Sequence, residues 1–108
     1  MAKPVGAFKK ILIATRGAIA ARIVRACREL GTKIIVVYTS VDAMAPYVSN
    51  ADEAYPLTGL RPNDSYLDQD QLMSIAELSK ADAVHPGYGF LSENATFAQR
   101  VIDAGMHF

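Results

Sequence analysis

The residue types best suited to binding lie together in one decapeptide, His85–Asn94 (HPGYGFLSEN). A mostly apolar run at residues 81–84 precedes it and a helical pattern at residues 95–104 follows, which predicts a loop between a buried strand and a helix. In an open parallel sheet, ligands bind at the carboxyl ends of the strands, where such loops lie. Tyr88 stands between two glycines with few chain neighbours, so it could face a ligand or a neighbouring domain. A tight, well-capped turn that binds nothing would use the same residue types.

Three charged or titratable side chains accompany this loop. His85, at the end of the buried strand, could act as a ligand or a base, but a hydrogen bond that orders the loop is the commoner role, and we assign it that role. Arg16 follows an earlier strand and could approach an anion, or it could pair with an acidic residue such as Glu93 or Asp42. Glu93 suits the positive end of the helix that follows it.

Composition argues against several classes of function. The 108 residues carry no formal net charge, which disfavours nucleic acid or an anionic membrane as the main partner. About half of the residues are apolar and about a fifth are charged, as in an ordinary soluble domain with one core. The single cysteine, Cys27, rules out an internal disulfide, fits a cytoplasmic setting and is expected in the core. No apolar run approaches membrane-spanning length, and residues 1–8 lack a signal-peptide pattern and are predicted to form a flexible lead-in.

Apolar runs and helical spacing alternate along the rest of the chain. Strands are predicted at residues 11–14, 33–38, 53–57 and 81–84, with the opening of a fifth at 106–108. Helices are predicted at 19–30, about 43–50, 68–79 and 95–104. This alternation predicts an α/β protein with a doubly wound, mostly parallel sheet of four to five strands and helices on both faces. The first turn has Gly17 alone where a dinucleotide site needs a G-x-G-x-x-G set, which counts against an ordinary NAD or FAD site.

Several residues set the boundaries of these elements. Pro46 should break or kink the short second helix, and Pro56 should confine the third strand to an edge of the sheet. Asp68, with a glutamine three residues later, is the predicted cap of the third helix. Ser92 or Asn94 can cap the last helix.

The helix at 19–30 carries two stripes of side chains. The apolar stripe expected to face the core consists of Ile19, Ile23, Ala26, Cys27 and Leu30. Another stripe consists of Arg22, Arg25 and Glu29. Such charges could pair across a two-fold axis, where an interface is self-complementary. They could equally form a solvated face in which one pair contributes roughly a few tenths of a kcal/mol.

Several segments together resemble biotin carboxylases. Ile11–Ala20, with Arg22-Ile23 behind it, resembles the first strand and turn of that family. The segments Val37-Tyr38, Ala51–Ala54 (ADEA), Ser65–Leu67 (SYL) and His85–Asn94 recur in the family in the same order and spacing. The decapeptide combined with the two upstream motifs is a specific signal. The resemblance runs from about Lys10 to Phe108, nearly the whole chain, and indicates the N-terminal domain of the family.

The resemblance implies a function for a longer protein. Biotin carboxylases, which occur in acetyl-CoA, propionyl-CoA and pyruvate carboxylases, use MgATP and bicarbonate to carboxylate a biotin carried on a lysine. An ATP-grasp region after this domain holds the nucleotide, the metals and the bicarbonate. Residues 9–108 would be a Rossmann-like N-terminal domain, truncated at its C-terminal side, inactive alone, with no catalytic residue, metal ligand or bound cofactor. The implied partners are the ATP-grasp region, the biotin carboxyl carrier protein, the carboxyltransferase and a second subunit in a homodimer, in the cytoplasm or the mitochondrial matrix.

The resemblance also implies roles for particular residues. Tyr88 and Gly89 would face the active site near the biotin, and Glu93 would help to position an arginine of the missing part. The whole wall of the biotin site would consist of Tyr88, Gly89, Glu93, His85, Gly87 and Arg16. The dimer contact would consist of Arg22, Arg25 and Glu29.

Two positions of the first turn depart from the family, which usually has Ala-Asn-Arg-Gly-Glu-Ile-Ala there. Thr15 replaces the asparagine, which removes a versatile donor and acceptor. Ala18 replaces the glutamate, which removes about half a kcal/mol of interaction with the helix dipole. These departures leave open a stand-alone α/β binding or assembly module without catalysis. A generic nucleotide-binding domain is a further alternative, but the sequence lacks phosphate-gripping elements.

Overall fold

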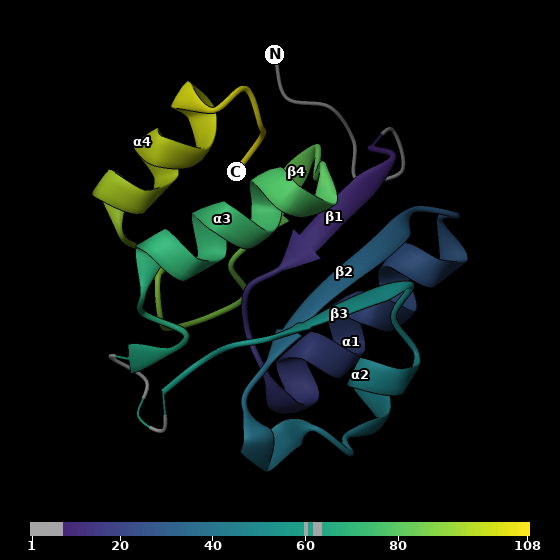
Figure 1. Cartoon of the computed structure of the whole chain (residues 1–108). Helices are drawn as coiled ribbons and strands as arrows, with labels where there is room; N and C mark the ends of the chain where they lie inside the picture. Colours follow the sequence, from purple (N-terminus) through teal and green to yellow (C-terminus); the bar gives the residue numbers. More distant parts are fainter. Residues whose placement is uncertain (1–7, 60, 62–63) are drawn as a thin grey trace.

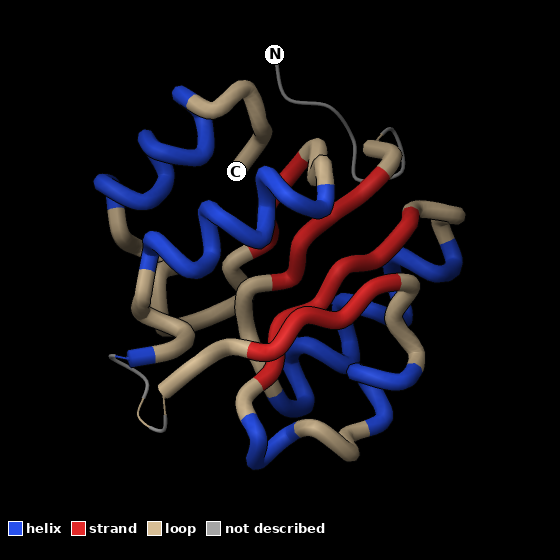
Figure 2. The backbone as a smooth tube through the Cα atoms, viewed as in Figure 1, coloured by secondary structure: helices blue, strands red, loops and turns tan. Residues whose placement is uncertain are grey.

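Four parallel strands lie at the centre of the protein, with helices on either side (Figures 1 and 2). This computed structural model describes residues 8–59, 61 and 64–108. The elements in chain order are β1 (Lys10–Ile13), α1 (Gly17–Glu29), β2 (Lys33–Tyr38), the 3-10 turn η2 (Ser40–Asp42), α2 (Pro46–Ser49), β3 (Glu53–Pro56), α3 (Gln69–Ser79), β4 (Ala83–His85) and α4 (Ala95–Asp103). The lead-in predicted for residues 1–8 lies outside the described residues apart from Phe8, whose ring packs against that of His107.

The sheet has the strand order β3-β2-β1-β4, and every pair of neighbouring strands is parallel. The register sets Ile13 of β1 beside His85 of β4. β3 forms an edge, as predicted from Pro56, whose nitrogen donates no ladder hydrogen bond. Beyond β4, His107 forms a parallel bridge with Ala83, at the predicted opening of a fifth strand. The predicted doubly wound α/β architecture is confirmed.

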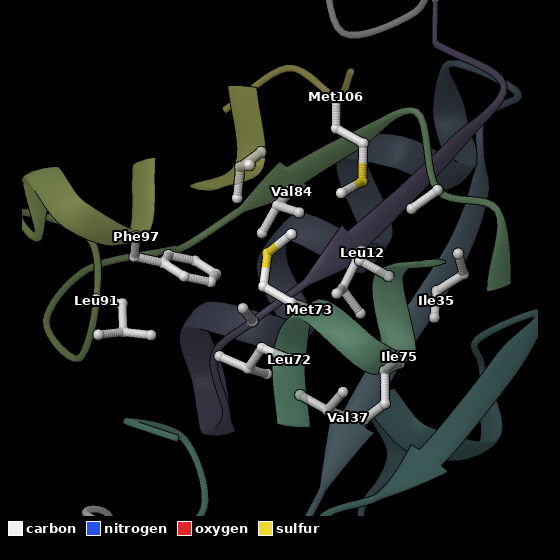
Figure 3. Close-up of a cluster of buried hydrophobic side chains, with 14 of the residues drawn as sticks. Leu12, Ile35, Val37, Leu72, Met73, Ile75, Val84, Leu91, Phe97 and Met106 are labelled. Carbon is white, nitrogen blue, oxygen red and sulfur yellow. The ribbon is translucent and has the colours of Figure 1, made fainter. Parts of the chain in front are cut away.

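Side chains of the strands alternate between two cores, because successive residues of a strand point to opposite faces. On one face, Leu12 and Val84 pack with Leu72 of α3 and Phe97 of α4 (Figure 3). The core on the opposite face, beneath α1 and α2, takes from the strands Ile11, Ile13, Ile34, Val36 and Ala83. Coverage of both faces explains why the central strands are continuous apolar runs rather than alternating ones.

Two predicted helix caps are confirmed. The Asp68 carboxylate accepts hydrogen bonds from the backbone N–H groups of Asp70 at 3.1 Å and Gln71 at 3.3 Å, at the start of α3. Of the two candidates for α4, Asn94 is the cap, because its Oδ1 accepts from the Phe97 N–H at 2.9 Å. Each cap satisfies donors that the first helical turn leaves unpaired.

The helix predicted at about 43–50 is shorter in the structure, and Pro46 lies at its start and not in its interior. The segment after β2 divides into the turn η2 and the short helix α2, and Pro46 is the first residue of α2. A proline fits this position because its missing N–H would have no partner within the helix, and its fixed φ angle suits the first turn. The proline therefore begins a helix here instead of interrupting one.

The buried face of α1 also differs from the prediction. The helix buries Ala20, Val24 and Cys27, and of the predicted core stripe only Cys27 belongs to this face. Leu30 is 54% exposed, and Ile23 is only partly buried. Small residues on the buried face allow α1 to lie close to the sheet. The helix is consequently apolar on two faces, one of which is not covered by the described residues.

Candidate functional site

The carboxyl ends of β1 and β4 lie side by side and place two loops at the same edge of the sheet. The Ala14 N–H donates to the His85 carbonyl at 2.9 Å, which joins the two chain segments where the strands end. The turn 15–16 and the loop 86–94 therefore start next to each other. At this edge Tyr88 is 77% exposed, so the central residue of the decapeptide lies on the surface and not beneath a packed core.

The backbone of the loop rests directly on Thr15, a buried residue. Gly87 has a φ of +68°, and a Cβ atom at this position would lie 2.6 Å from Thr15 Cγ2. A larger residue therefore fits only if Thr15 moves. The Gly87 N–H donates to His85 Nδ1 at 3.1 Å, which is a loop-ordering contact of the kind predicted for His85. Burial lowers the pKa of His85, so the ring is neutral at pH 7 and can accept this hydrogen bond.

The middle of the loop is held by an aromatic pair. Phe90 adopts a φ of +44°, in the left-handed region that non-glycine residues rarely occupy. Its ring stacks on Tyr66, with 4.9 Å between the ring centroids and 13° between the ring planes. Gly89, with a φ of +72°, is exposed beside Tyr88, and Glu93 is exposed further along the chain. Residues 87–90 are thus held at both ends, with Tyr88 and Gly89 exposed between them.

Arg16 pairs with Asp42, one of the two carboxylates considered for it. Its Nε and Nη2 each donate to an Asp42 carboxylate oxygen at 2.6 Å, and the Tyr47 hydroxyl donates to the same carboxylate at 3.2 Å. The hydrogen bond between them lowers the pKa of Asp42 and raises the pKa of Arg16. Burial raises the pKa of Tyr47. The Arg16 guanidinium is therefore already engaged at this edge of the sheet.

A groove with a volume of about 510 Å³ connects the loop to α1. Its walls include Ile19, Ile23 and Leu30 from the uncovered face of α1, together with His85 and Tyr88. The groove is therefore mostly apolar, with an imidazole and a phenol among its polar groups. Concave apolar surface with a few polar groups is typical of a site for an organic ligand or for another part of a protein.

The residues predicted for a dimer contact are exposed on α1, but they line two separate hollows. Arg22 lines the groove described above, whereas Arg25 and Glu29 line a second hollow of about 310 Å³ between α1 and α2. An ion pair joins Arg28 Nη1 of this helix to Asp52 Oδ1 at 3.2 Å. Helical spacing does not single out Arg28, because its partner Asp52 lies outside the helix, directly before β3.

Sequence reasoning missed Tyr66 and Tyr47 as parts of this site. Tyr66 is 2% exposed although it lies in the connection between β3 and α3. Tyr66 belongs to the Ser65–Leu67 motif of the resemblance, but neither this motif nor its residue type specifies Phe90 as its partner. In the described part of the chain, no group of three or more His, Cys, Asp or Glu residues could hold a metal ion. None of the helices described there combines the length and the apolar character needed to cross a membrane.

Fold and site together define a parallel α/β domain with an exposed loop at the carboxyl edge of its sheet, the edge at which such domains bind ligands. Over residues 7–108 the chain matches the family model of the biotin carboxylase N-terminal domain. The match covers nearly the whole chain, and the chain therefore belongs to this family.

Similar proteins support the assignment. Biotin carboxylase 1 of Bacillus subtilis (strain 168) is 49% identical over 101 residues, which cover 94% of this chain and 22% of the relative. The biotin-dependent acyl-coenzyme A carboxylase alpha3 subunit of Mycobacterium leprae (strain TN) is 52% identical over 97 residues, which cover 90% of this chain and 16% of that subunit. The biotin carboxylase domain dimer of Hydrogenobacter thermophilus 2-oxoglutarate carboxylase, crystallised with MgADP, ADP and bicarbonate, matches with a TM-score of 0.85 and 44% identity, over 92% of this chain and 22% of that one. The chain thus spans roughly a fifth of the length of these relatives.

Proposed function

We propose that this chain forms one wall of the biotin site of a biotin carboxylase, with Tyr88 and Gly89 facing the biotin. The position of Tyr88 carries the proposal, because this phenol is 77% exposed at the carboxyl edge of the sheet and lines a mostly apolar groove. The biotin ring system is compact and largely apolar, with one polar ureido group. An apolar groove with few polar groups suits such a ligand. Gly89 adds exposed backbone that no side chain covers.

We assign the biotin carboxylase activity to a longer protein, because the described residues include no loop or side chain suited to bind the phosphates of ATP. The turn after β1 has the single glycine Gly17, and its Arg16 is paired with Asp42. The Hydrogenobacter relative was crystallised with MgADP and bicarbonate. The nucleotide, the magnesium and the bicarbonate belong, in this proposal, to an ATP-grasp region downstream. The whole protein would carboxylate biotin on a carrier protein and pass the carboxyl group to a carboxyltransferase, in the cytoplasm or the mitochondrial matrix.

The chain's own residues position the substrate in this proposal and transfer no proton. His85 orders the loop through its hydrogen bond from the Gly87 N–H. Glu93 is exposed beyond the loop and offers a carboxylate with which an arginine of the downstream region can pair. Tyr88 supplies an aromatic surface beside the ring of biotin.

We further propose that the exposed face of α1 contacts a second subunit through Arg22, Arg25 and Glu29. All three side chains are exposed, and opposite charges on one helix can pair across a two-fold axis. The Hydrogenobacter relative was crystallised as a dimer of biotin carboxylase domains. In the longer protein, Arg25→Glu should raise the dimer dissociation constant about tenfold or more, as sedimentation velocity can measure. Lys80→Glu, an equal charge reversal on an exposed residue after α3, is the control.

The test of the catalytic assignment joins this chain to its natural downstream sequence. We expect bicarbonate-dependent ATP cleavage that free biotin stimulates. Tyr88→Ala should lower kcat/KM for biotin about tenfold or more and leave the KM for ATP unchanged. Val41→Ala is the matched control, because Val41 is 79% exposed after β2 but lies outside the loop. A well-folded longer protein without biotin-stimulated ATP cleavage would refute the assignment.

A further inference from the structure

Phe90 has an unusual backbone conformation for its residue type. Its φ of +44° lies in the left-handed region, which a bulky side chain occupies only where its surroundings impose it. In the described part of the chain, Lys80 is the other non-glycine residue with a positive φ, and it caps the end of α3, where that conformation is common. Phe90 caps no helix, so its conformation has a different cause.

In this conformation the ring of Phe90 stacks on Tyr66. The ring centroids are 4.9 Å apart and the ring planes differ by 13°, which is a parallel aromatic arrangement. Tyr66 is 2% exposed and belongs to the core between the sheet and the helices α3 and α4. Because Tyr66 comes from the connection between β3 and α3, the stack fastens the loop after β4 to a rigid residue of another segment.

The beginning of the same loop is fastened independently. Gly87 donates its N–H to His85, and its Cα lies so close to Thr15 that a Cβ atom would be 2.6 Å from Thr15 Cγ2. Tyr88 lies between the two fastened points and is itself 77% exposed. Because it has little contact of its own, the direction of its side chain follows from the backbone at Gly87 and Phe90.

We infer that Tyr66 and Phe90 are positioning residues, which hold residues 87–90 in one conformation and so aim Tyr88 at the biotin. The inference rests on the proposed function, because it requires the loop to contact biotin. Neither residue touches the substrate, and both act through the loop backbone. We assign this role to the ring of Tyr66, because the ring makes the contact with Phe90, whereas the hydroxyl lies near Tyr47, the Thr39 backbone and Asp42.

The experiment uses the longer protein and two readouts. Tyr66→Leu removes the aromatic ring and keeps apolar bulk, whereas Tyr66→Phe keeps the ring and is the matched control. In Tyr66→Leu, amide hydrogen exchange of the peptide covering residues 86–94 should accelerate about tenfold, and kcat/KM for biotin should fall about tenfold, with the KM for ATP within about twofold of wild type. Tyr66→Phe should match wild type in both readouts. Phe90→Leu, with Phe90→Tyr as its conservative partner, repeats the test from the loop side if Tyr66→Leu fails to fold.

The outcomes separate the inference from the proposed function. Unchanged loop exchange and unchanged biotin kinetics in Tyr66→Leu and Phe90→Leu would overturn the inference. A loss of kcat/KM that is equal for biotin and ATP would also overturn it, because a merely structural defect affects both substrates. A folded wild-type protein without biotin-stimulated ATP cleavage would refute the proposed function, and the exchange rates would still decide whether the stack fixes the loop.

Discussion

Gly87→Ala should destabilise the protein more than Gly89→Ala, although the two glycines have nearly the same φ, +68° and +72°. The left-handed conformation costs an alanine about 1–2 kcal/mol at either position. The surroundings differ, because a Cβ atom at Gly87 would meet Thr15 Cγ2 at 2.6 Å and Thr15 Cβ at 2.8 Å, whereas one at Gly89 meets nothing within 4 Å. The pair of variants therefore separates the backbone strain from the steric clash.

The clash at Gly87 adds a second contribution because Thr15 cannot yield easily. Carbon atoms in ordinary contact are about 3.5–4.0 Å apart, so the two groups must separate by about 1 Å. Thr15 is 1% exposed, and its branched side chain is stiff about χ1. Overpacking of a close-packed site costs about 1–3 kcal/mol. Gly87→Ala should thus lower the free energy of unfolding by about 2–5 kcal/mol and Gly89→Ala by about 1–2 kcal/mol.

Urea-induced unfolding followed by far-UV circular dichroism measures both values by linear extrapolation. The double variant Thr15→Ser/Gly87→Ala removes Cγ2, the atom of the closest contact, and should recover part of the loss. Recovery should be incomplete, because Thr15 Cβ at 2.8 Å remains in place. A double-mutant cycle gives this coupling directly. Equal losses at the two glycines would show that the loop does not rest on Thr15.

Two further changes test other features of the structure. Asp42→Asn should lower the free energy of unfolding at pH 7 by about 1–3 kcal/mol, a value reduced because the Arg16 side chain is 44% exposed. The hydrogen bond from Arg16 lowers the pKa of Asp42 in the folded protein. The extra stability of wild type over Asp42→Asn should therefore be fully present above the unfolded-state pKa of about 3.8 and be lost as the pH falls through the folded-state pKa. Urea unfolding of both proteins between about pH 7 and pH 3 measures this difference in stability. Lys80→Gly should raise the free energy of unfolding by about 0.5–1 kcal/mol, because Lys80 ends α3 with a φ of +59°, where glycine carries no strain; an unchanged or lowered urea midpoint would contradict this.

The strands and the caps were predictable because they depend on residues close together in the sequence. The apolar run at residues 11–14 needs only burial on both faces to form a strand, and that condition follows from the alternation of strands and helices. Asp68 and Asn94 each reach a backbone N–H within three residues. Such contacts form whatever the rest of the fold does, so local chemistry is sufficient to predict them.

The contacts that shape the candidate site join distant segments, and the sequence does not specify them. Thr15 and Gly87 were each noted for their residue type, but their approach depends on β1 and β4 being neighbours. The stack of Tyr66 on Phe90 likewise requires the connection after β3 to lie beside the loop after β4. Residue types alone identified the loop, whereas the contacts that hold it depend on which strands and loops lie side by side in the fold.

The face of α1 that the sequence predicts to be buried differs from the face that the structure buries, for a physical reason. Ile19, Ile23 and Leu30 are larger than Ala20, Val24 and Cys27, so hydrophobic burial alone favours the larger stripe in the core. The structure instead packs the smaller residues on the sheet, and the larger ones line the groove.

Val24→Ala should therefore cost this chain more stability than Ile23→Ala, although isoleucine is the larger side chain. Val24 is 4% exposed, and its truncation leaves a cavity that should lower the free energy of unfolding by about 1–3 kcal/mol. Ile23→Ala should lower it by less than about 1 kcal/mol in the chain alone, because water already reaches that face. In the longer protein the cost of Ile23→Ala should rise toward that of Val24→Ala, because we expect the uncovered stripe to pack there against another part of the assembly. Urea unfolding of both variants in both proteins measures the change, and an Ile23→Ala cost that stays the same in the two contexts would show that nothing covers this face of α1.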